Sequence, residues 1–448
     1  MRVLFVEIDS ETAWGVASLG PGFLAPLLRR AGHQVEFFRA SADMPPEAFV
    51  DRVEDVDPGL LGLSLTTRQW LRARELIGYL RERHDVPVIA GGLHPTFAAE
   101  QVLATPGFDY VCLGEGEEAM LELVERLDSG RSLGPLSGIR NIWVRGGMKP
   151  PLRPPFEPID ELPFIARDLL DEYPGVVHMA TQRGCPFPCT YCAARKYADL
   201  YDDRSYGRRR SIDNVFAELR ELDAATPLRW ISFLDDTFTI HHPWVREFCR
   251  RYPDEIGTDF GILARVETVN ERMIHALAAA GCKLITYGVE SGSERVRRQI
   301  MHRPVTNQRF KDVIGWTRAA GIRSVCNYML GLPGETRDDL RQTLELASEL
   351  ESFDLCYYVF YPYPGTALYR VCVDEGLLPD DVEDLPANHR QTILRLRHLD
   401  NDDIAEFYDK FTALREHRLL ARQVAESEHS DADRRALKAE VDRYAQTN

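Results

Sequence analysis

The sequence predicts two α/β domains in tandem, a doubly wound parallel sheet followed by six further βα units, and then a helical C-terminal region. Short apolar runs alternate with amphipathic segments of about 10 to 15 residues, first up to residue 127 and again between residues 176 and 361. This alternation is typical of βαβ units and of a parallel sheet. A proline-rich stretch at residues 150–155 separates the two series.

Composition and charge limit the class of protein. We expect the first domain at residues 1–145, a linker at 146–170, the second domain at 171–370 and the helical region at 371–448. The 448-residue chain has a formal net charge of −16, which argues against a nucleic-acid partner, because such partners favour a basic face. No signal peptide and no apolar run of about 18 residues is recognisable. We therefore expect a soluble, cytoplasmic protein without a membrane partner.

The first domain has the pattern of a flavodoxin-like (Rossmann-type) sheet. Strands are predicted at residues 3–8, 35–39, 62–66, 88–90 and 110–113. Helices are predicted at residues 19–31, 68–83, 96–103 and 117–127. In such a sheet the ligand crevice lies at the carboxyl ends of the strands.

Small and glycine-rich residues follow these strands, at the edge where the crevice is expected. Paired glycines allow the backbone to approach a bulky ligand closely, although tight turns between strands and helices also favour glycine. The candidate ligand contacts are Gly20, Ser64, Thr66, Gly91, Gly92, His94, Gly114, Glu115 and Gly116.

After the first domain the pattern changes to a connector and then resumes. A hairpin is predicted at residues 139–144, before the semi-rigid proline-rich stretch. Strands of the second domain are predicted at residues 176–180, 230–234, 260–265, 284–289, 325–330 and 357–361. Helices lie between them, including residues 336–350, whose apolar side chains share one face.

The loop after the first of these strands carries three cysteines, Cys185, Cys189 and Cys192, in the spacing C-x3-C-x2-C. Three thiolates on one loop can hold three irons of a 4Fe-4S cluster and leave the fourth iron open to a small molecule. A zinc site needs a fourth ligand, and no further Cys or His stands at a suitable spacing. A disulfide is not expected in a chain without secretory features. The spacing therefore predicts an iron–sulfur cluster.

With this cysteine loop, the second domain resembles the radical S-adenosylmethionine (SAM) enzymes, which have an open (βα)6 barrel. The resemblance implies that the cysteines hold the cluster and that SAM binds its open iron. The SAM contacts that it implies are Asp235 or Asp236 for the ammonium, Arg265 for the carboxylate, Glu290 and Ser291 for the ribose and carboxylate, and Tyr191 for the adenine. Helix caps, a structural salt bridge or core packing are the alternative explanations of these residues.

The first domain resembles the cobalamin-binding domain that precedes the barrel in many radical SAM enzymes, through its GG-x-HPT and GEGE segments. The resemblance implies that the glycine-rich loops bind cobalamin. No D-x-H-x-x-G motif occurs, so base-off cobalamin without a protein histidine on cobalt is implied. His94 is expected to be a turn residue or a contact to the corrin side chains. A domain that no longer binds cobalamin is the alternative.

As a whole the resemblance implies an enzyme that cleaves SAM reductively and, with cobalamin as methyl carrier, methylates an unactivated carbon of a small-molecule substrate. Oxidative cyclisation, ring contraction or another non-methylating rearrangement is the alternative. A methylthiotransferase would need cysteines for a second cluster in the first domain, where only Cys112 is present. A cobalamin sensor with an inert barrel would not need the cysteine loop. The expected protein partner is an electron donor such as flavodoxin or ferredoxin, and no side chain is assigned a catalytic role.

Overall fold

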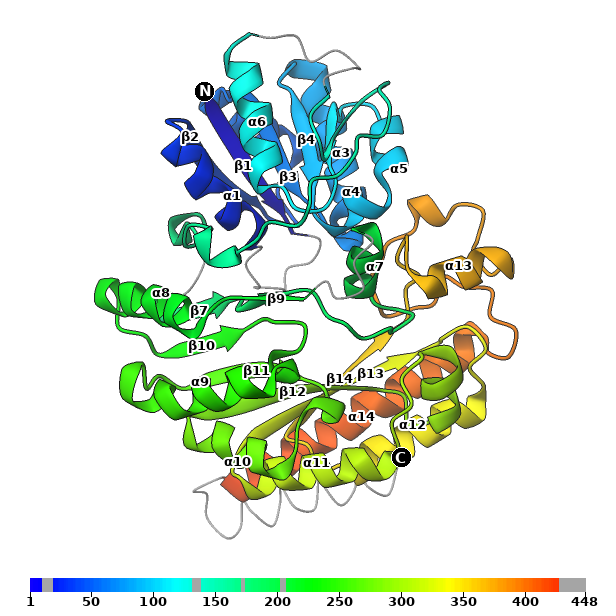
Figure 1. Ribbon diagram of the computed structural model, residues 1–448. Helices are drawn as coiled ribbons and strands as arrows, with labels where there is room; N and C mark the ends of the chain where they lie inside the picture. The colour runs from blue at the N-terminus through cyan, green and yellow to red at the C-terminus, as the bar shows by residue number, and fades with distance from the viewer. Residues whose placement is uncertain (10–18, 131–137, 171–173, 202–206, 427–448) are drawn as a thin grey trace.

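Two six-stranded sheets, each formed by a continuous part of the chain, organise the protein (Figure 1). The structure is a computed structural model and describes residues 1–9, 19–130, 138–170, 174–201 and 207–426. The first sheet lies at the top of Figure 1 and the second below it. The junction between them is where the predicted ligand-binding segments of both domains lie.

The first sheet has the strand order β2-β1-β3-β4-β5-β6. Its strands are β1 (Arg2–Ile8), β2 (Gln34–Ala40), β3 (Leu60–Ser64), β4 (Val88–Gly91), β5 (Tyr110–Cys112) and β6 (Ile142–Val144). Strands β1 to β5 are parallel, and β6 pairs antiparallel with β5. The predicted doubly wound sheet is therefore confirmed, with an antiparallel edge strand in addition.

Helices cover both faces of this sheet, because successive side chains of a strand point to opposite sides. The helices are α1 (Leu19–Arg30), α2 (Pro46–Val56), α3 (Trp70–Arg83), α4 (Leu93–Phe97), α5 (Ala99–Ala104) and α6 (Glu117–Asp128). Val3 and Phe5 of β1 belong to the apolar core shared with α1 and α6. Leu4 and Val6 belong to the core shared with α2, α3 and α5. Burial on both faces explains why the strands read as continuous apolar runs.

Three local features differ from the prediction. Helix α2 is not among the expected elements, although Phe49, Val50, Val53 and Val56 are buried at helical spacing. The hairpin expected at residues 139–144 is wrong: the segment contributes one strand, β6, which pairs with β5 rather than with its own neighbour. The helix expected at residues 96–103 is divided into α4 and α5 at Ala98, whose backbone is not helical (φ −126°, ψ 36°).

The second sheet has the order β14-β13-β12-β11-β10-β7, and every neighbouring pair is parallel. Its strands are β7 (Val176–Met179), β10 (Trp230–Phe233), β11 (Phe260–Ala264), β12 (Cys282–Glu290), β13 (Arg323–Leu330) and β14 (Asp354–Val359). Strands adjacent in sequence are adjacent in the sheet, as in a partial (βα)6 barrel. All six predicted strands are confirmed within a few residues.

Helices cover the outer face of the barrel sheet and leave its other face toward the first domain (Figure 1). They are α8 (Ile212–Ala225), α9 (His242–Glu255), α10 (Glu271–Ala279), α11 (Asn307–Ala319) and α12 (Arg337–Glu349). The C-terminal region adds α13 (Ala367–Asp374) and α14 (Asn401–Glu426), and α14 contacts β14 and α12. Among the described residues, no helix is long and apolar enough to cross a membrane.

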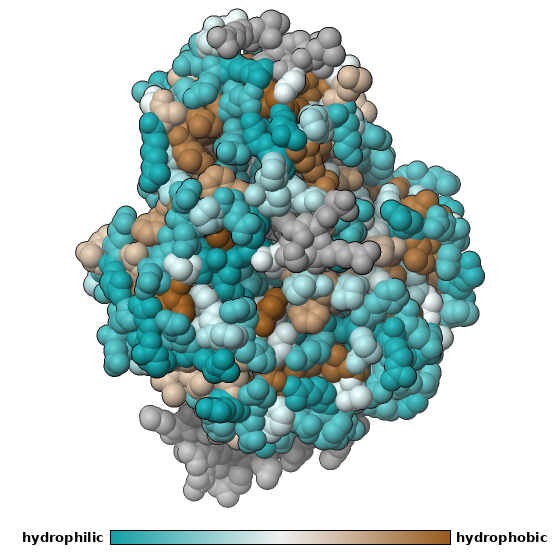
Figure 2. All heavy atoms as spheres, in the orientation of Figure 1, coloured by the Kyte–Doolittle hydropathy of each residue, from teal (hydrophilic) through white to brown (hydrophobic). Residues whose placement is uncertain are grey.

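Three small elements lie between the sheets. Strand β8 (Gln182–Arg183) pairs antiparallel with β9 (Arg208–Arg209), and α7 (Ala193–Leu200) follows the cysteine loop. Figure 2 shows that this face of the molecule is mostly hydrophilic, with apolar residues visible over the first domain. The cysteine loop is thus carried by elements that already contact both domains.

Candidate active site between the two domains

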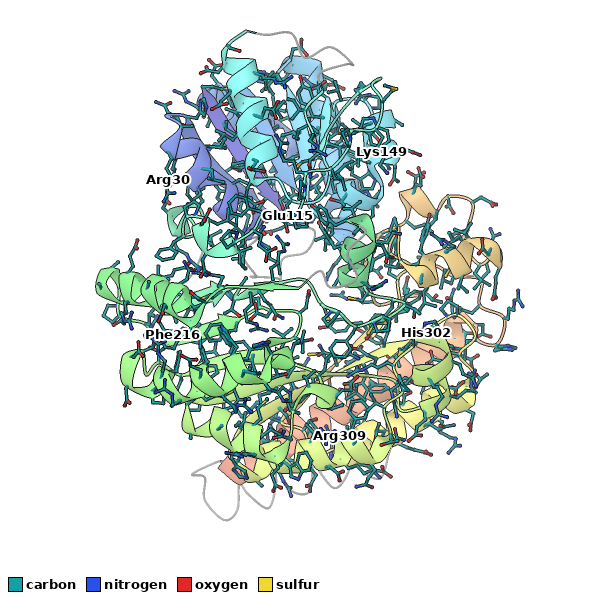
Figure 3. The ribbon with its side chains drawn as sticks, in the orientation of Figure 1. Arg30, Glu115, Lys149, Phe216, His302 and Arg309 are labelled. Carbon is teal, nitrogen blue, oxygen red and sulfur yellow. The ribbon has the colours of Figure 1, made fainter. Side chains whose placement is uncertain are left out.

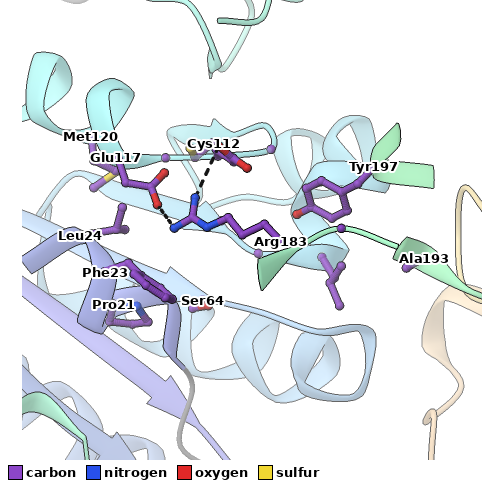
Figure 4. A pocket seen from close by; sticks show the side chains of 18 of the residues that line it. Pro21, Phe23, Leu24, Ser64, Cys112, Glu117, Met120, Arg183, Ala193 and Tyr197 are labelled. Atoms are coloured by element: carbon purple, nitrogen blue, oxygen red, sulfur yellow. Dashed lines mark hydrogen bonds and ion pairs between the residues drawn. The ribbon is translucent and has the colours of Figure 1, made fainter. Parts of the chain in front are cut away.

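A cavity of about 540 Å³ lies between the carboxyl ends of the first sheet and the cysteine loop of the barrel. Figure 4 shows it from close by, with Arg183 reaching into it. The predicted site residues that line it are Gly20, Ser64, Gly91, Gly92, Gly114, Glu115 and Gly116 from the first domain, and Cys192, Asp235 and Asp236 from the barrel. The structure therefore brings one edge of each sheet to a single shared cavity.

Two of these glycines are required by the protein's own backbone. Gly92 has φ 94°, and a Cβ there would lie 2.8 Å from the Leu65 carbonyl oxygen. Gly114 has φ 71°, and a Cβ there would lie 2.2 Å from the Tyr201 hydroxyl. Gly91 differs, since its nearest neighbour would be the Cys112 Cβ at 3.6 Å. Gly91 is thus the position where absence of a side chain leaves room toward the cavity.

Two of the contacts predicted in the first domain, Thr66 and His94, do not line this cavity, and the same holds for these predicted residues of the barrel: Cys185, Cys189, Tyr191, Arg265, Glu290 and Ser291. Thr66 forms a capping box with Gln69 at the start of a short 3₁₀ turn. His94 is buried and stacks on Trp70 with ring centroids 4.9 Å apart, and its Nδ1 lies 3.3 Å from the Thr67 hydroxyl. Burial lowers the pKa of His94 to about 4, so the ring is neutral at pH 7. Both residues have local structural roles, and their contact with cobalamin stays a prediction.

The apolar part of the cavity was not predicted. Phe5, Gly62, Ile89, Cys112 and Met120 form its inner wall, between the sheet and helices α1 and α6. These residues look like ordinary core in the sequence. The sequence could have shown that these residues share one face of the sheet, because alternate residues of β1 and β4 point toward α1 and α6.

The cysteine loop is held firmly against the barrel. The Thr190 hydroxyl donates to the Ile300 carbonyl (2.7 Å), and the Thr190 N–H donates to the Met301 carbonyl (3.3 Å). Cys185 and Cys189 are buried, and Arg265 Nη1 donates to Cys189 Sγ at 3.0 Å. Burial raises the pKa of Cys192 to about 12; a hydrogen bond from the Ala194 backbone opposes the rise, and the charges of Asp236 and the other two cysteines add to it. The three sulfurs are therefore electrostatic neighbours.

The donor set fits a cluster better than a single ion. In the part of the chain that the structure describes, no group of three His, Cys, Asp or Glu side chains surrounds a point suited to one metal ion. Three thiolates that each bind a different iron of a cube need not converge on one point. Arg265 would offset part of their negative charge, which favours the thiolate form that iron requires.

The structure separates Asp235 from Asp236. Asp235 is buried and accepts hydrogen bonds from the Thr181 N–H (2.7 Å), the Thr181 hydroxyl (2.5 Å) and the Gln182 N–H (2.9 Å). Asp236 is exposed to the cavity. The protein walls around it, and then the charge of Asp235, raise the pKa of Asp236 to about 6. Asp235 thus holds the segment before the cysteines, whereas Asp236 presents a carboxylate to a ligand.

Arg265 is part of an ion network that includes a buried arginine missed by the prediction. Arg265 lies over the Phe187 ring at 3.9 Å and pairs with Glu267 at 2.5 Å. Arg303 is buried and donates to both carboxylate oxygens of Glu267, at 3.0 and 2.9 Å. Burial alone would raise the pKa of Glu267, but the hydrogen bonds and charge of Arg303 lower it to about 2. The network fixes the guanidinium of Arg265 beside the cysteine loop.

Glu290 and Ser291 end β12 in different environments. Glu290 has φ 70°, and its Oε1 lies 4.0 Å from Arg303 Nη1. Burial raises the pKa of Glu290, and the charge of Arg303 opposes that rise. Ser291 is fully buried, and its hydroxyl lies 3.1 Å from that of Thr343 in α12. That hydroxyl joins two elements of the barrel, and its role toward SAM stays a prediction.

The two domains are joined through the same segments that line the cavity. Arg183, two residues before Cys185, pairs with Glu115 (3.4 Å) and with Glu117 (Figure 4). Arg208 also pairs with Glu115, which Figure 3 places at the junction. The hydroxyl of Tyr201 accepts a hydrogen bond from the Glu115 N–H at 2.7 Å. None of these pairs is visible in the sequence, because each joins segments at least 66 residues apart.

Comparison with known protein families agrees with this arrangement. The model of the radical SAM superfamily matches residues 179–347, and that of the B12 binding domain matches residues 16–124. The uncharacterized methyltransferase PH0819 of Pyrococcus horikoshii is 30% identical over 92% of this chain and 91% of its own length. The chain belongs to the radical SAM enzymes with a cobalamin-binding domain.

Other relatives of this family differ in chemistry. The anaerobic magnesium-protoporphyrin IX monomethyl ester cyclase of Rubrivivax gelatinosus is 24% identical over 84% of this chain and 70% of its own length. The solved structure of the methyltransferase TsrM from Kitasatospora setae, with cobalamin and cluster bound, has a TM-score of 0.70 at 15% identity and covers 100% of this chain and 99% of that one. OxsB with aqua-cobalamin and SAM bound has a TM-score of 0.73 at 16% identity, over 100% of this chain and 70% of that one. These structures share the fold of the cobalamin-dependent radical SAM enzymes.

Membership of this family implies a 4Fe-4S cluster, SAM and cobalamin as cofactors. The residues present fit all three. The thiols of the cysteine loop are soft ligands for iron, and Asp236 offers a carboxylate where the cavity meets Cys192. The glycine-rich strand ends and the apolar wall behind them leave room for a bulky ligand next to the first sheet.

Proposed function

We propose that the protein is a methyltransferase that adds a methyl group to an unactivated carbon of a small molecule. The observation that carries the proposal is the shared cavity, in which the glycine-rich strand ends of the first domain face Cys192 and Asp236 of the barrel. When bound there, the cluster would supply an electron to SAM and cobalamin would carry the methyl group. Relatives named as methyltransferases support this reading.

The side chains of the cavity, and of the ion network around Arg303 beside the cysteine loop, would bind and orient rather than react. Asp236 would receive the ammonium of SAM, since an ionised carboxylate is a strong acceptor for it. Arg265, held by Glu267, would pair with the SAM carboxylate, and Glu290 would accept from the ribose hydroxyls. Cys185, Cys189 and Cys192 would hold the cluster. Bound cofactors that fill the cavity between the two domains would limit the access of water to the reactive centre.

A non-methylating reaction is the second candidate, because a cyclase is also among the relatives. It would use the same SAM site and would not consume the methyl group of SAM. We expect an electron donor such as flavodoxin or ferredoxin in either case. The cytoplasm, a reducing compartment, suits a chain with nine free cysteines.

The test follows both halves of SAM without knowledge of the substrate. Protein reconstituted anaerobically with iron, sulfide and hydroxocobalamin is reduced and incubated with SAM, and the products are quantified by mass spectrometry. Formation of S-adenosylhomocysteine that depends on added cobalamin supports methyl transfer. Formation of 5'-deoxyadenosine alone supports the second candidate. Formation of neither product, with iron and cobalt both bound, would overturn both candidates.

A further inference from the structure

The segment of residues 114–117, between β5 and the first residue of α6, contacts the chain on both sides of the cysteine loop. All four of its residues line the shared cavity. On one side, Arg183 precedes the first cysteine by two residues and pairs with Glu115 and Glu117 (Figure 4). On the other side, the hydroxyl of Tyr201 accepts the N–H of Glu115 at 2.7 Å. A segment that faces the cavity is therefore held from both flanks of the three cysteines.

Helix α7 connects the last cysteine to Tyr201. Cys192 is the N-cap of this helix and Tyr201 is its C-cap, so eight helical residues separate the two. Their hydrogen bonds make the connection a rod of about 12 Å rather than a flexible loop. The helix also contacts the first domain through Tyr197, whose ring lies edge-on to that of Phe97 at 5.3 Å. The position of Cys192 therefore determines the position of the acceptor for the Glu115 N–H.

The ion pairs of this contact are shielded from water. Glu117 and Arg208 are buried, and the side chains of Glu115 and Arg183 are mostly buried. Arg208 donates to Glu115 at 3.1 Å, so two carboxylates face two guanidinium groups within this group. Removal of one partner would leave a buried charge uncompensated, which is strongly unfavourable. The group thus favours one relative position of the first domain and the chain before the cysteines.

The two metal-containing cofactors of this family would act on opposite ends of this contact. The three cysteines are free thiols, and a cluster would tie them together and fix both flanks of their loop. Cobalamin in the shared cavity would lie against the 114–117 segment. A ligand binds more tightly when the segment that contacts it is already held in place, because less ordering is required. A cluster that fixes Arg183 and Tyr201 thus prepares the segment that cobalamin contacts.

We propose that Arg183 and Tyr201 are positioning residues that couple the two cofactor sites, so that a cluster in the cysteine loop strengthens the binding of cobalamin. By linkage, cobalamin then favours the cluster-bound form in turn. The two residues act through the 114–117 segment and not on reacting atoms. The inference goes beyond the proposed function, and it holds for methyl transfer and for a non-methylating reaction alike.

The test compares two dissociation constants of hydroxocobalamin, measured by anaerobic equilibrium dialysis with cobalt quantified by mass spectrometry. One is measured for the iron-free protein and the other for protein reconstituted with iron and sulfide. In the wild-type protein the second constant should be about tenfold lower, since coupled sites usually differ by about 5- to 150-fold. Tyr201→Phe, which removes the acceptor of the Glu115 N–H, and Arg183→Gln should each reduce this ratio to about threefold or less. Arg183→Lys retains the charge and should keep more of the ratio than Arg183→Gln.

A matched control separates this coupling from domain contact in general. Arg74 of the first domain pairs with Asp384 of the C-terminal region at 2.7 Å, and neither residue lines the shared cavity. Arg74→Gln should therefore keep the wild-type ratio. Arg183 lines the cavity itself, but a direct contact with cobalamin of equal strength in both forms would change both constants by the same factor. Tyr201 does not line the cavity, so its effect passes through the Glu115 backbone.

Four results would overturn the inference. They are no binding of cobalamin to either form, wild-type constants that agree within about twofold, a wild-type ratio retained by Tyr201→Phe or by Arg183→Gln, and loss of the ratio in Arg74→Gln. Iron content is measured in every sample, so that the constants refer to cluster-loaded protein. Dialysis requires no turnover. Equal constants would therefore leave the test of methyl transfer intact, and absence of S-adenosylhomocysteine in that test would leave the coupling standing.

Discussion

Asp235 and Asp236 are neighbours in sequence, and their replacement by alanine should have opposite consequences. Asp235→Ala removes the acceptor for two backbone N–H groups and for the hydroxyl of Thr181. Each buried N–H that loses its partner costs about 1–3 kcal/mol. The variant no longer buries a carboxylate away from water, which offsets part of this cost, so the free energy of unfolding should fall by about 2–4 kcal/mol in total. Asp236→Ala removes a side chain that is open to the cavity, so stability should change by no more than about 0.5 kcal/mol.

The assay is thermal unfolding of both variants, followed by the iron content after reconstitution and by SAM binding in dialysis. Asp235→Ala should lower the melting temperature by about 5–10 °C and reduce bound iron, because the segment before Cys185 loses its anchor. Asp236→Ala should keep the melting temperature and the iron, and should weaken SAM binding by about tenfold, the effect of one charged hydrogen bond. Equal effects of the two substitutions on stability would refute the distinction drawn from the hydrogen bonds.

Three further predictions concern backbone, charge and metal. Gly92→Ala should destabilise the protein by about 2–4 kcal/mol, because a positive φ costs about 1–2 kcal/mol and the new Cβ meets backbone at 2.8 Å. Gly91→Ala should change the free energy of unfolding in urea by no more than about 1 kcal/mol and should weaken cobalamin binding. Glu267→Gln should destabilise the protein by about 3 kcal/mol, because buried Arg303 loses its partner. The pKa of Glu267 is lowered to about 2 from 4.5, so its contribution to stability is present above pH 4.5 and is lost as the pH falls toward 2, and this loss should be absent from the pH profile of the glutamine variant. Cys192→Ala should lose most of the reconstituted iron and its visible absorption, and retention of wild-type iron would contradict the assignment of the cysteine loop.

The elements of the fold were predictable where the sequence pattern is local. Each strand that is buried on both faces reads as an apolar run, and each helix between strands has one apolar face. The hairpin at residues 139–144 failed because an edge strand and a hairpin arm have the same local pattern. The partner of β6 is a strand about 30 residues earlier, and nothing near residue 142 identifies it. Ala98 breaks a helix although alanine favours helices, which is an override by tertiary structure.

The site was predictable only where the pattern is local, that is, where its residues directly follow a strand. Positions after parallel strands meet at one edge, so the glycine loops and Cys192 could be placed together. The contacts that complete the site join distant segments, as Arg303 does with Glu267, and Arg183 with Glu115. Thr66 and His94 also follow strands, but Thr66 bonds locally to Gln69 and His94 stacks on Trp70, and neither lines the cavity. The position of a residue after a strand predicts the sheet edge at which it lies, whereas side-chain packing decides whether it faces the ligand.

The pairing of Arg183 with Glu115 and Glu117, and of Tyr201 with the backbone of Glu115, has a consequence for protein engineering. A chimera that joins this first domain to a barrel with other residues at positions 183, 201 and 208 would separate Glu115 and Glu117 from their partners. Buried charges without partners would then remain at the seam, at a cost of several kcal/mol. A recombinant joined at the linker therefore needs all the residues of this interdomain group from the same parent protein.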